Sequence, residues 1–452
     1  MRTALALVIA LLLDSLLWAQ TGVPTAVGQA PAPYGNGQQP LLSYSGTAPL
    51  SDVLLLSVNS VVSYDDNVLG TTQPRMADEI LGLGPRLTIM QQHPHLTLSI
   101  DYEPYFQFYQ HLTQYDHVNQ VLAGDVTYTV GPRFSLRLRD SFSDRTGAYQ
   151  TVSNQEFVPG LGSPTALNNN IYNPFASERS NDARVDIIYS SSSRTSVTLF
   201  GGYGQSKYTD QQPDVSGLLN TLGFTGGLQY NYRLSTHSSL GVVYTYQVFQ
   251  YEGNVAVGSP SRFITNSGVL SLAWQASPSV SVQVFGGPQY LPAEKQFVGA
   301  SSGSAPTPGN VSSPALWSWT AGGTVTKSSE KTTLHVSVGR SVTNGGGFLT
   351  MATNAYADFG VSRRLIRRWS ASCDLNGAYS KGLSPGYTGS TIESLNGTVG
   401  LEHPLSEHIN TSLAYTLTRQ NAKGPVPFGA DLNHDVVSLT VSYQFTKIPL
   451  GH

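Results

Sequence analysis

Regular alternation of apolar and polar residues near the end of the chain constrains the fold more than any other feature. From Val437 to Phe445 every second residue is apolar, and Ser, Thr or Gln stands at each position between. Because successive side chains of a β-strand point to opposite faces, this stretch is predicted to be a strand with one apolar and one polar face. Such a strand belongs either to a sandwich, with its apolar face on a protein core, or to a transmembrane barrel, with that face toward lipid.

The same alternation recurs from Val53 onward, in units of strand, short turn, strand and longer loop. The clearest pair covers residues 222–234 and 240–248. Short connections with turn residues alternate with long ones rich in polar residues, Gly and Pro. The long connections are 65–78, 144–181, 208–218, 252–262, 292–313, 381–391 and 421–433. We therefore predict that residues 51–452 form an all-β transmembrane antiparallel barrel of about 18 strands (16–18), with short periplasmic turns and long outer loops.

Composition favours the barrel over its soluble rivals. Charged residues are only 12% of the 452 residues, yet the mean hydropathy is −0.13 and no apolar run after the N-terminus approaches the roughly 20 residues of a spanning helix. A propeller or tandem sandwiches are the alternatives, but the predicted strands of about 12 to 15 residues are long for soluble sheets. The bacterial outer membrane is the expected location and its lipid the expected surroundings. No basic cluster points to nucleic acid.

The N-terminal region is predicted to lie outside the barrel. Arg2 followed by the apolar run Ala4 to Leu13 indicates a secretory signal peptide over residues 1–19, with an uncleaved anchor as the alternative. Residues 20–50 are predicted to be a flexible periplasmic arm rich in Pro, Gly and Gln, or else a short plug. Cys373 is the only cysteine, which rules out an intramolecular disulfide, and its strand pattern places it toward lipid.

The polar face of each strand is expected to line the lumen, and a barrel of about 16 to 18 strands is wide enough for an aqueous channel. A porin-like channel for polar solutes follows as the functional prediction. General diffusion is one alternative, and a structural or adhesive barrel with a blocked lumen is another. Arg137, Arg139, Arg184 and Asp186 are predicted to form a charge cluster on the inner wall, either as a structural ion-pair ladder or as a selectivity element. The loop 144–181 either folds inward or lies over the mouth.

Two short segments resemble features of known bacterial families. Tyr64-Asp65-Asp66-Asn67 resembles the "YDDN" signature of a family of outer-membrane β-barrel porins, many of them associated with exopolysaccharide operons or a surface-protein sorting system. The resemblance implies an outer-membrane protein with a role in secreting or modifying a surface polysaccharide. The segment Val437–Phe445 resembles the C-terminal signal strand of outer-membrane barrels, which implies recognition by the barrel-assembly machinery.

By residue type, Asp65, Asp66 and Asn67 form turns readily, so we expect a solvated turn there, with a cation or sugar contact as the alternative. Trp317 and Trp319 share one strand face and are predicted to lie in an aromatic girdle. The run Gly345-Gly346-Gly347 is predicted to be part of an outer loop. No H-E-x-x-H spacing occurs, and His–Asp pairs near Ser arise easily by chance in a Ser-rich chain. We therefore expect no enzymatic activity, no metal and no cofactor.

Overall fold

A computed structural model describes most of the barrel region. The described residues are 52–70, 74–147, 172, 176–209, 218–252, 262–296, 311–313, 315–366, 368–384, 387, 389–424 and 431–450. The predicted signal peptide and the arm over residues 20–50 lie outside these residues and stay predictions. Among the described residues, no helix is long and apolar enough to cross a membrane.

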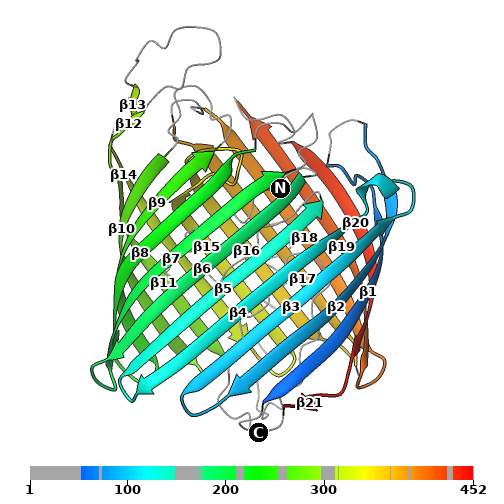
Figure 1. Cartoon of the computed structure of the whole chain (residues 1–452), viewed down its shortest axis with the longest axis horizontal. Helices are drawn as coiled ribbons and strands as arrows, with labels where there is room; N and C mark the ends of the chain where they lie inside the picture. The colour runs from blue at the N-terminus through cyan, green and yellow to red at the C-terminus, as the bar shows by residue number, and fades with distance from the viewer. Residues whose placement is uncertain are drawn as a thin grey trace, which may run out of the picture.

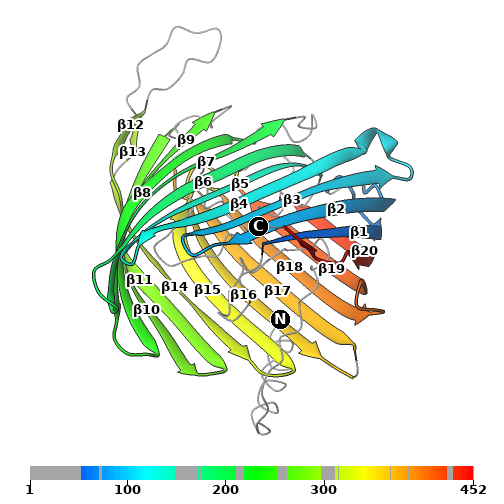
Figure 2. The ribbon, with the colours of Figure 1, turned by 60° about the horizontal axis from the view of Figure 1, so that its bottom comes forward.

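One closed antiparallel barrel contains nearly all of the described chain (Figures 1 and 2). Its eighteen strands are β1 (Val53–Asp65), β2 (Asp78–Gln92), β3 (Leu96–Tyr109), β4 (His117–Gly131), β5 (Phe134–Gly147), β6 (Ala176–Ser190), β7 (Thr195–Thr209), β8 (Asn220–Arg233), β9 (Ser238–Glu252), β10 (Arg262–Ser277), β11 (Val280–Leu291), β14 (Leu316–Ser328), β15 (Thr332–Thr343), β16 (Ala352–Arg364), β17 (Ser370–Gly382), β18 (Thr391–Pro404), β19 (Ile409–Lys423) and β20 (Leu432–Gln444). Each strand pairs with the next along the chain, and β1 pairs with β20 to close the ring. The predicted fold and strand number are confirmed.

Three short strands and one helical turn lie outside the barrel wall. The strands β12 (Glu294–Gln296) and β13 (Val311–Ser313) pair with each other, and a 3-10 turn covers Thr113–Tyr115. The strand β21 (Ile448–Pro449) pairs with the first residues of β1. The backbone N–H of Phe445 donates to the carbonyl of Leu56 (3.0 Å). The chain after β20 therefore folds back along the start of β1.

The two ends of the barrel differ in the length of their connections, as predicted. The lower end in Figure 1, which we call the short-turn rim, has turns such as 93–95 and 132–133. The upper end, which we call the long-loop rim, has connections such as 66–77, 148–175 and 344–351. Several strands are longer than expected, because β5 continues to Gly147 and β6 begins at Ala176. The predicted loop 144–181 is therefore shortened to 148–175.

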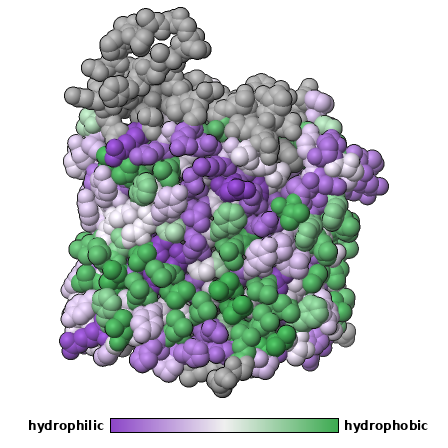
Figure 3. Space-filling model, in the orientation of Figure 1, coloured by the Kyte–Doolittle hydropathy of each residue, from purple (hydrophilic) through white to green (hydrophobic). Residues whose placement is uncertain are grey.

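Large apolar side chains cover the outer wall and are exposed there. They include Leu199, Leu228, Val242, Leu270, Val338, Val399, Leu413 and Leu439, each 49% to 54% exposed. Figure 3 shows this apolar surface over the half of the barrel nearer the short-turn rim, with more polar side chains toward the long-loop rim. Soluble monomers rarely expose continuous apolar patches of this extent, so the band is suited to lipid.

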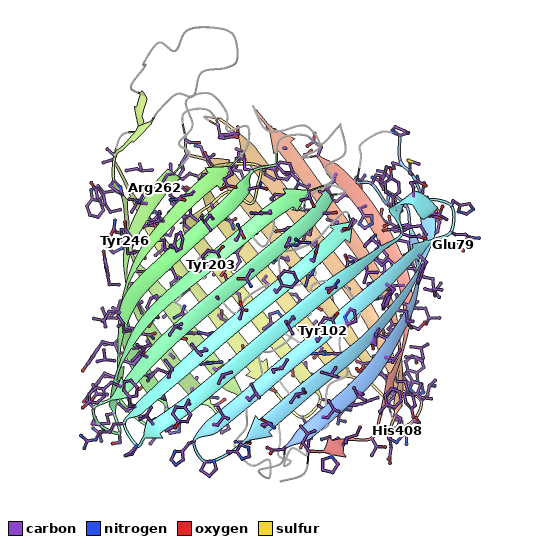
Figure 4. All side chains as sticks on the ribbon, in the orientation of Figure 1. Glu79, Tyr102, Tyr203, Tyr246, Arg262 and His408 are labelled. Carbon is purple, nitrogen blue, oxygen red and sulfur yellow. The ribbon has the colours of Figure 1, made fainter. Side chains whose placement is uncertain are left out.

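Aromatic residues also lie on the outer wall. Trp317 and Trp319 are 70% and 53% exposed, which fits the predicted girdle. The ring of Trp317 contacts Tyr290, with 4.7 Å between the ring centroids. By strand register, Tyr102, Tyr203 and Tyr246, labelled in Figure 4, lie on the outward faces of β3, β7 and β9. Rings with a polar tip at the two edges of an apolar band are typical of membrane barrels.

On the inner wall, bulky rings lie against glycines of neighbouring strands. Tyr105 is 4% exposed and covers Gly82, where an added Cβ would lie 1.8 Å from the tyrosine Oη. Phe200 covers Gly227 in the same way, and Phe285 covers Gly322. The missing side chain gives each ring room to lie flat along the wall instead of projecting into the lumen.

A Gly82→Val substitution is therefore expected to lower the free energy of unfolding by about 2 kcal/mol, since the valine and the Tyr105 ring compete for one space. Urea unfolding of the protein in lipid vesicles measures this loss. Gly124→Val is the matched control, because Gly124 has nothing within 4 Å of an added Cβ. Equal losses in the two variants would contradict the proposed packing role of Gly82.

Candidate functional site: the lumen wall and an inward-folded segment

The strand register shows which charged side chains face the lumen. Two groups of them differ in character. The first, which we call the ion-pair ladder, runs across β2 to β6 and contains Arg86, Asp101, Asp125, Arg137, Arg139, Arg184 and Asp186. The second, which we call the acidic face, lies on β16 to β18 and contains Asp358, Asp374 and Glu402.

Within the ion-pair ladder, arginines and aspartates of neighbouring strands bind one another. The Nε of Arg86 donates to both carboxylate oxygens of Asp101 (2.9 and 3.0 Å). Arg137 binds Asp125 through two of its nitrogens, with the Nε 3.0 Å from Oδ2. Fork-shaped pairing of guanidinium with carboxylate fixes both side chains. These contacts hold the side chains against the wall.

The structure divides the predicted cluster into a group of three residues and the separate Arg137–Asp125 pair. Arg139 donates to Asp186 Oδ2 (2.7 Å), and Arg184 Nε donates to Asp186 Oδ1 (2.8 Å). The Arg184 guanidinium also lies 4.5 Å from the ring centroid of Phe200. Arg137 does not join this group, because its partner Asp125 lies on β4, on the other side of β5. Sequence reasoning omitted Asp125 and the Arg86–Asp101 pair, although both lie on predicted strands with the correct alternation. Whether the cluster affects solute passage stays a prediction.

The Asp65-Asp66-Asn67 motif joins the first and last strands of the barrel. Asp65 is 6% exposed and its Oδ1 lies 2.8 Å from Nε2 of His434 on β20. The backbone N–H of Asn67 donates to the same carboxylate (2.8 Å), and its side-chain amide donates to the carbonyl of Asn433 (3.0 Å). We call this group the seam clasp.

Asp66 completes the seam clasp from the outer side. Its backbone N–H donates to the carbonyl of Asp435 (3.1 Å), and its Oδ1 accepts from the backbone N–H of Asp435 (2.7 Å). Arg75 binds the other carboxylate oxygen at 3.1 Å. The expectation of a solvated turn is wrong for Asp65 and Asn67, since both are buried by pairing with β20. Among the described residues, no group of three His, Cys, Asp or Glu side chains is arranged to hold a metal ion.

The connection between β15 and β16 folds into the barrel at the long-loop rim. Residues 344–351, which we call the inward segment, are all buried. Gly345, Gly346 and Gly347 have φ values of 77°, 63° and 85°, a region that residues with a Cβ rarely adopt. An added Cβ on Gly345 would lie 2.2 Å from the carbonyl oxygen of Leu349. The three glycines therefore permit the tight turn that directs the segment inward.

Contacts with distant strands hold the inward segment in place. The carbonyl of Gly347 accepts a hydrogen bond from the backbone N–H of Leu219 (2.8 Å), next to β8. The Tyr251 hydroxyl on β9 donates to the carbonyl of Asn344 (3.1 Å). Phe348 and Leu349 are fully buried in an apolar cluster formed with Ala176, Tyr208, Leu218, Ala352, Tyr387 and Ile392. The segment thus reaches from β15 to the wall formed by β6 to β9 and narrows the lumen at this rim.

One described residue of the long loop 148–175 also lies inside the barrel. Tyr172 is 2% exposed, and its backbone N–H and carbonyl both bind the side-chain amide of Gln420 on the inner face of β19 (2.8 and 2.9 Å). Burial raises the pKa of the Tyr172 hydroxyl well above its usual value. The position of Tyr172 therefore agrees with the alternative in which this loop folds inward, and not with the one in which it lies over the mouth.

The run Gly345-Gly346-Gly347 was predicted to be part of an outer loop, and the inward direction of the segment was not predicted. The signal that would have revealed it is the apolar sequence Phe348-Leu349-Thr350-Met351 directly after three glycines. Three large apolar side chains among four consecutive residues of a short connection need a buried environment.

A G-x-S-x-G sequence begins at Gly382, in the connection between β17 and β18. In hydrolases this pattern places an exposed serine between a strand and a helix. Here Ser384 is fully buried, and its hydroxyl hydrogen-bonds the hydroxyl of Thr350 in the inward segment (2.8 Å). Its environment is therefore that of a packing contact.

The fold and lumen define the class of protein as a closed eighteen-strand β-barrel with an apolar outer wall and a polar inner wall. No protein-family model matches the sequence, and no curated protein matches it. Similar solved structures include three proteins of Pseudomonas aeruginosa. OccK2 (OpdF) is 10% identical, with a TM-score of 0.44 over 88% of this chain and 98% of that one. The outer membrane protein OpdK is 11% identical (TM-score 0.43, 88% and 99%), and the siderophore receptor PirA is 10% identical (TM-score 0.40, 88% and 81%). At this level of similarity no substrate transfers from them.

Proposed function

We propose that the protein is an outer-membrane, porin-like channel for small polar solutes, with its narrowest part at the inward segment. The observation that carries the proposal is the combination of a polar, charge-paired lumen wall with a connection that folds into that lumen. The apolar outer wall supports a location in lipid, and the contrast between short turns and long loops supports the outer membrane.

The resemblance to porins of exopolysaccharide operons supports a more specific proposal, passage of a surface polysaccharide. A polymer chain needs a continuous wide path, so this function requires the inward segment to move away from the wall formed by β6 to β9. General diffusion of small solutes requires no such movement. We also propose that the barrel-assembly machinery binds the segment Val437–Phe445.

Single-channel recording in planar bilayers tests the channel. The purified, folded full chain is expected to give stable current steps, and a variant without residues 20–50 tests the arm as a plug. Steps that appear only in the shortened chain would make the arm the obstacle. Silence in both proteins, each shown to be folded, would contradict the channel and favour a structural barrel. Current block by a polysaccharide, but not by its monosaccharide, would support passage of the polymer.

A further inference from the structure

We infer that the lumen selects for cations, so that its solutes are positively charged or neutral polar molecules. This inference rests on the proposed channel function and specifies the substrate class of that channel.

The inward charges of the described strands are unequal in number. Eleven carboxylates face the lumen side of the wall, namely Asp65, Asp78, Asp101, Glu103, Asp125, Glu178, Asp182, Asp186, Asp358, Asp374 and Glu402. Seven guanidiniums face the same way, namely Arg86, Arg137, Arg139, Arg145, Arg184, Arg233 and Arg364. The wall therefore carries an excess of negative charge.

Across β2 to β6 every inward arginine is paired with a carboxylate or lies beside one. Besides the ion-pair ladder, Arg145 lies opposite Glu178 in the strand register, and Asp182 is two residues from Arg184 on the same face of β6. Five arginines thus meet five of the seven carboxylates in this part of the wall, and the other two are Asp78 and Glu103. Because these arginines are held by aspartates or lie beside carboxylates, they offer little free positive charge to a passing anion.

The carboxylates of the acidic face are not matched by a similar number of arginines. Within the described parts of β14 to β20, Arg364 is the single inward guanidinium, and it lies at the short-turn rim. Asp358 receives hydrogen bonds from Asn376 (3.3 Å) and contacts His335 Nε2 at 2.8 Å. Even with His335 protonated, the three carboxylates of this face keep it negative.

Gly360 allows the side chains of His335 and Asp374 to approach each other. An added Cβ there would lie 2.0 Å from Cε1 of His335 and 2.5 Å from Oδ1 of Asp374. Both side chains therefore occupy the space above this glycine. Glu402 extends the face toward the short-turn rim, where Ser370 donates to its Oε2 (3.4 Å).

At the long-loop rim, most of the segments between strands add no positive charge, and Arg75 in the connection after β1 is paired with Asp66. By sequence, residues 148–171, 210–217, 253–261, 297–310 and 425–430 contain no lysine or arginine. A pore with walls of one net sign concentrates counter-ions, and rings of acidic side chains favour cations in channels. The expected cation-to-anion permeability ratio is about 3 or more at low salt, falling as salt screens the wall.

Reversal potentials in a KCl gradient test the inference with the full chain. Asp358→Asn/Asp374→Asn/Glu402→Gln is expected to lower the permeability ratio by about half or more, while Arg137→Gln/Arg139→Gln, which removes two positive charges, is expected to raise it. Asp140→Asn and Glu393→Gln are matched controls, because these carboxylates lie on the outward face of β5 and β18 and leave the ratio unchanged.

The possible failures are distinguishable. A conducting wild-type channel that is unselective or prefers anions would overturn the inference and leave the channel intact. An unchanged ratio in the triple variant, shown to be folded by its heat-modified mobility in gels, would also overturn it. A folded wild-type protein that never conducts would instead contradict the proposed function. In that case the cation-to-anion permeability ratio would be measured in a variant without the inward segment. An unselective pore in this variant would overturn the inference, whatever the fate of the proposed function.

Discussion

Replacing residues 344–351 with the dipeptide Asn-Gly is expected to raise single-channel conductance by about two- to fivefold, because current depends on the narrowest part of a pore. The strand register makes this replacement natural. Thr343 and Ala352 are paired across β15 and β16, so a two-residue turn joins them directly, and Asn-Gly suits such hairpins. The change removes the buried residues that reach the opposite wall and leaves every barrel strand in register.

A double variant tests whether the inward segment itself obstructs the pore, as distinct from a general loosening of the rim. Phe348→Ser/Leu349→Ser introduces two hydroxyls into the buried cluster, and it is expected to give larger or noisier current steps as the segment detaches. Leu405→Ser is the matched control, since Leu405 is 57% exposed in a turn at the short-turn rim and its loss leaves the lumen unchanged. Unchanged conductance in the folded Asn-Gly variant would show that the inward segment does not limit the pore.

The wall of the barrel was predictable from sequence because apolar and polar residues alternate along each strand, and this alternation identifies its outward and inward faces. Alternating segments such as Val437–Phe445 define the outward side chains, and the alternation of short and long connections defines the two rims. Even Cys373 and Trp319 lie on the faces that their patterns predict. Strand ends were less certain, because a polar strand above the lipid level, such as the last residues of β5, has the composition of a loop.

The interior of the rim was not predictable in the same way. A connection between strands has no period, so its sequence does not report whether it points outward or inward. Gly345 to Gly347 were compatible with both. The inward direction of the segment depends on its contacts with apolar residues from β6 to β9. These residues come close to the segment only once the barrel has closed.

The seam clasp shows the same limit for a polar motif. Asp65, Asp66 and Asn67 are good turn formers in isolation, and local propensity therefore indicated solvent exposure. The contact that buries them joins residues 366 positions apart, from Asn67 to Asn433. Sequence placed β1 and β20 at the two ends of the sheet, but it did not reveal that the motif and the start of β20 bind one another where the ring closes.

Asp65→Ala is expected to lower the free energy of unfolding by about 3 kcal/mol, because it removes a buried carboxylate that contacts both the His434 ring and the Asn67 N–H. The substitution removes the carboxylate beside the His434 ring, which is 4% exposed, and takes the acceptor from the Asn67 N–H. Since the clasp joins the first strand to the last, the loss acts on closure of the barrel. Heat-modified mobility in gels and urea unfolding in vesicles measure it.

A double-substitution cycle decides whether the clasp acts as a unit. If Asp65 and His434 stabilise the seam through one another, Asp65→Ala/His434→Ala is expected to cost little more than Asp65→Ala alone. Glu393→Ala is the matched control, because its pairing with Lys423 at 4.0 Å is exposed and such contacts contribute less than about 1 kcal/mol. A loss in Asp65→Ala no greater than in Glu393→Ala would show that β1 and β20 are held by their backbone hydrogen bonds alone. The buried motif would then need another explanation, such as a contact made during assembly.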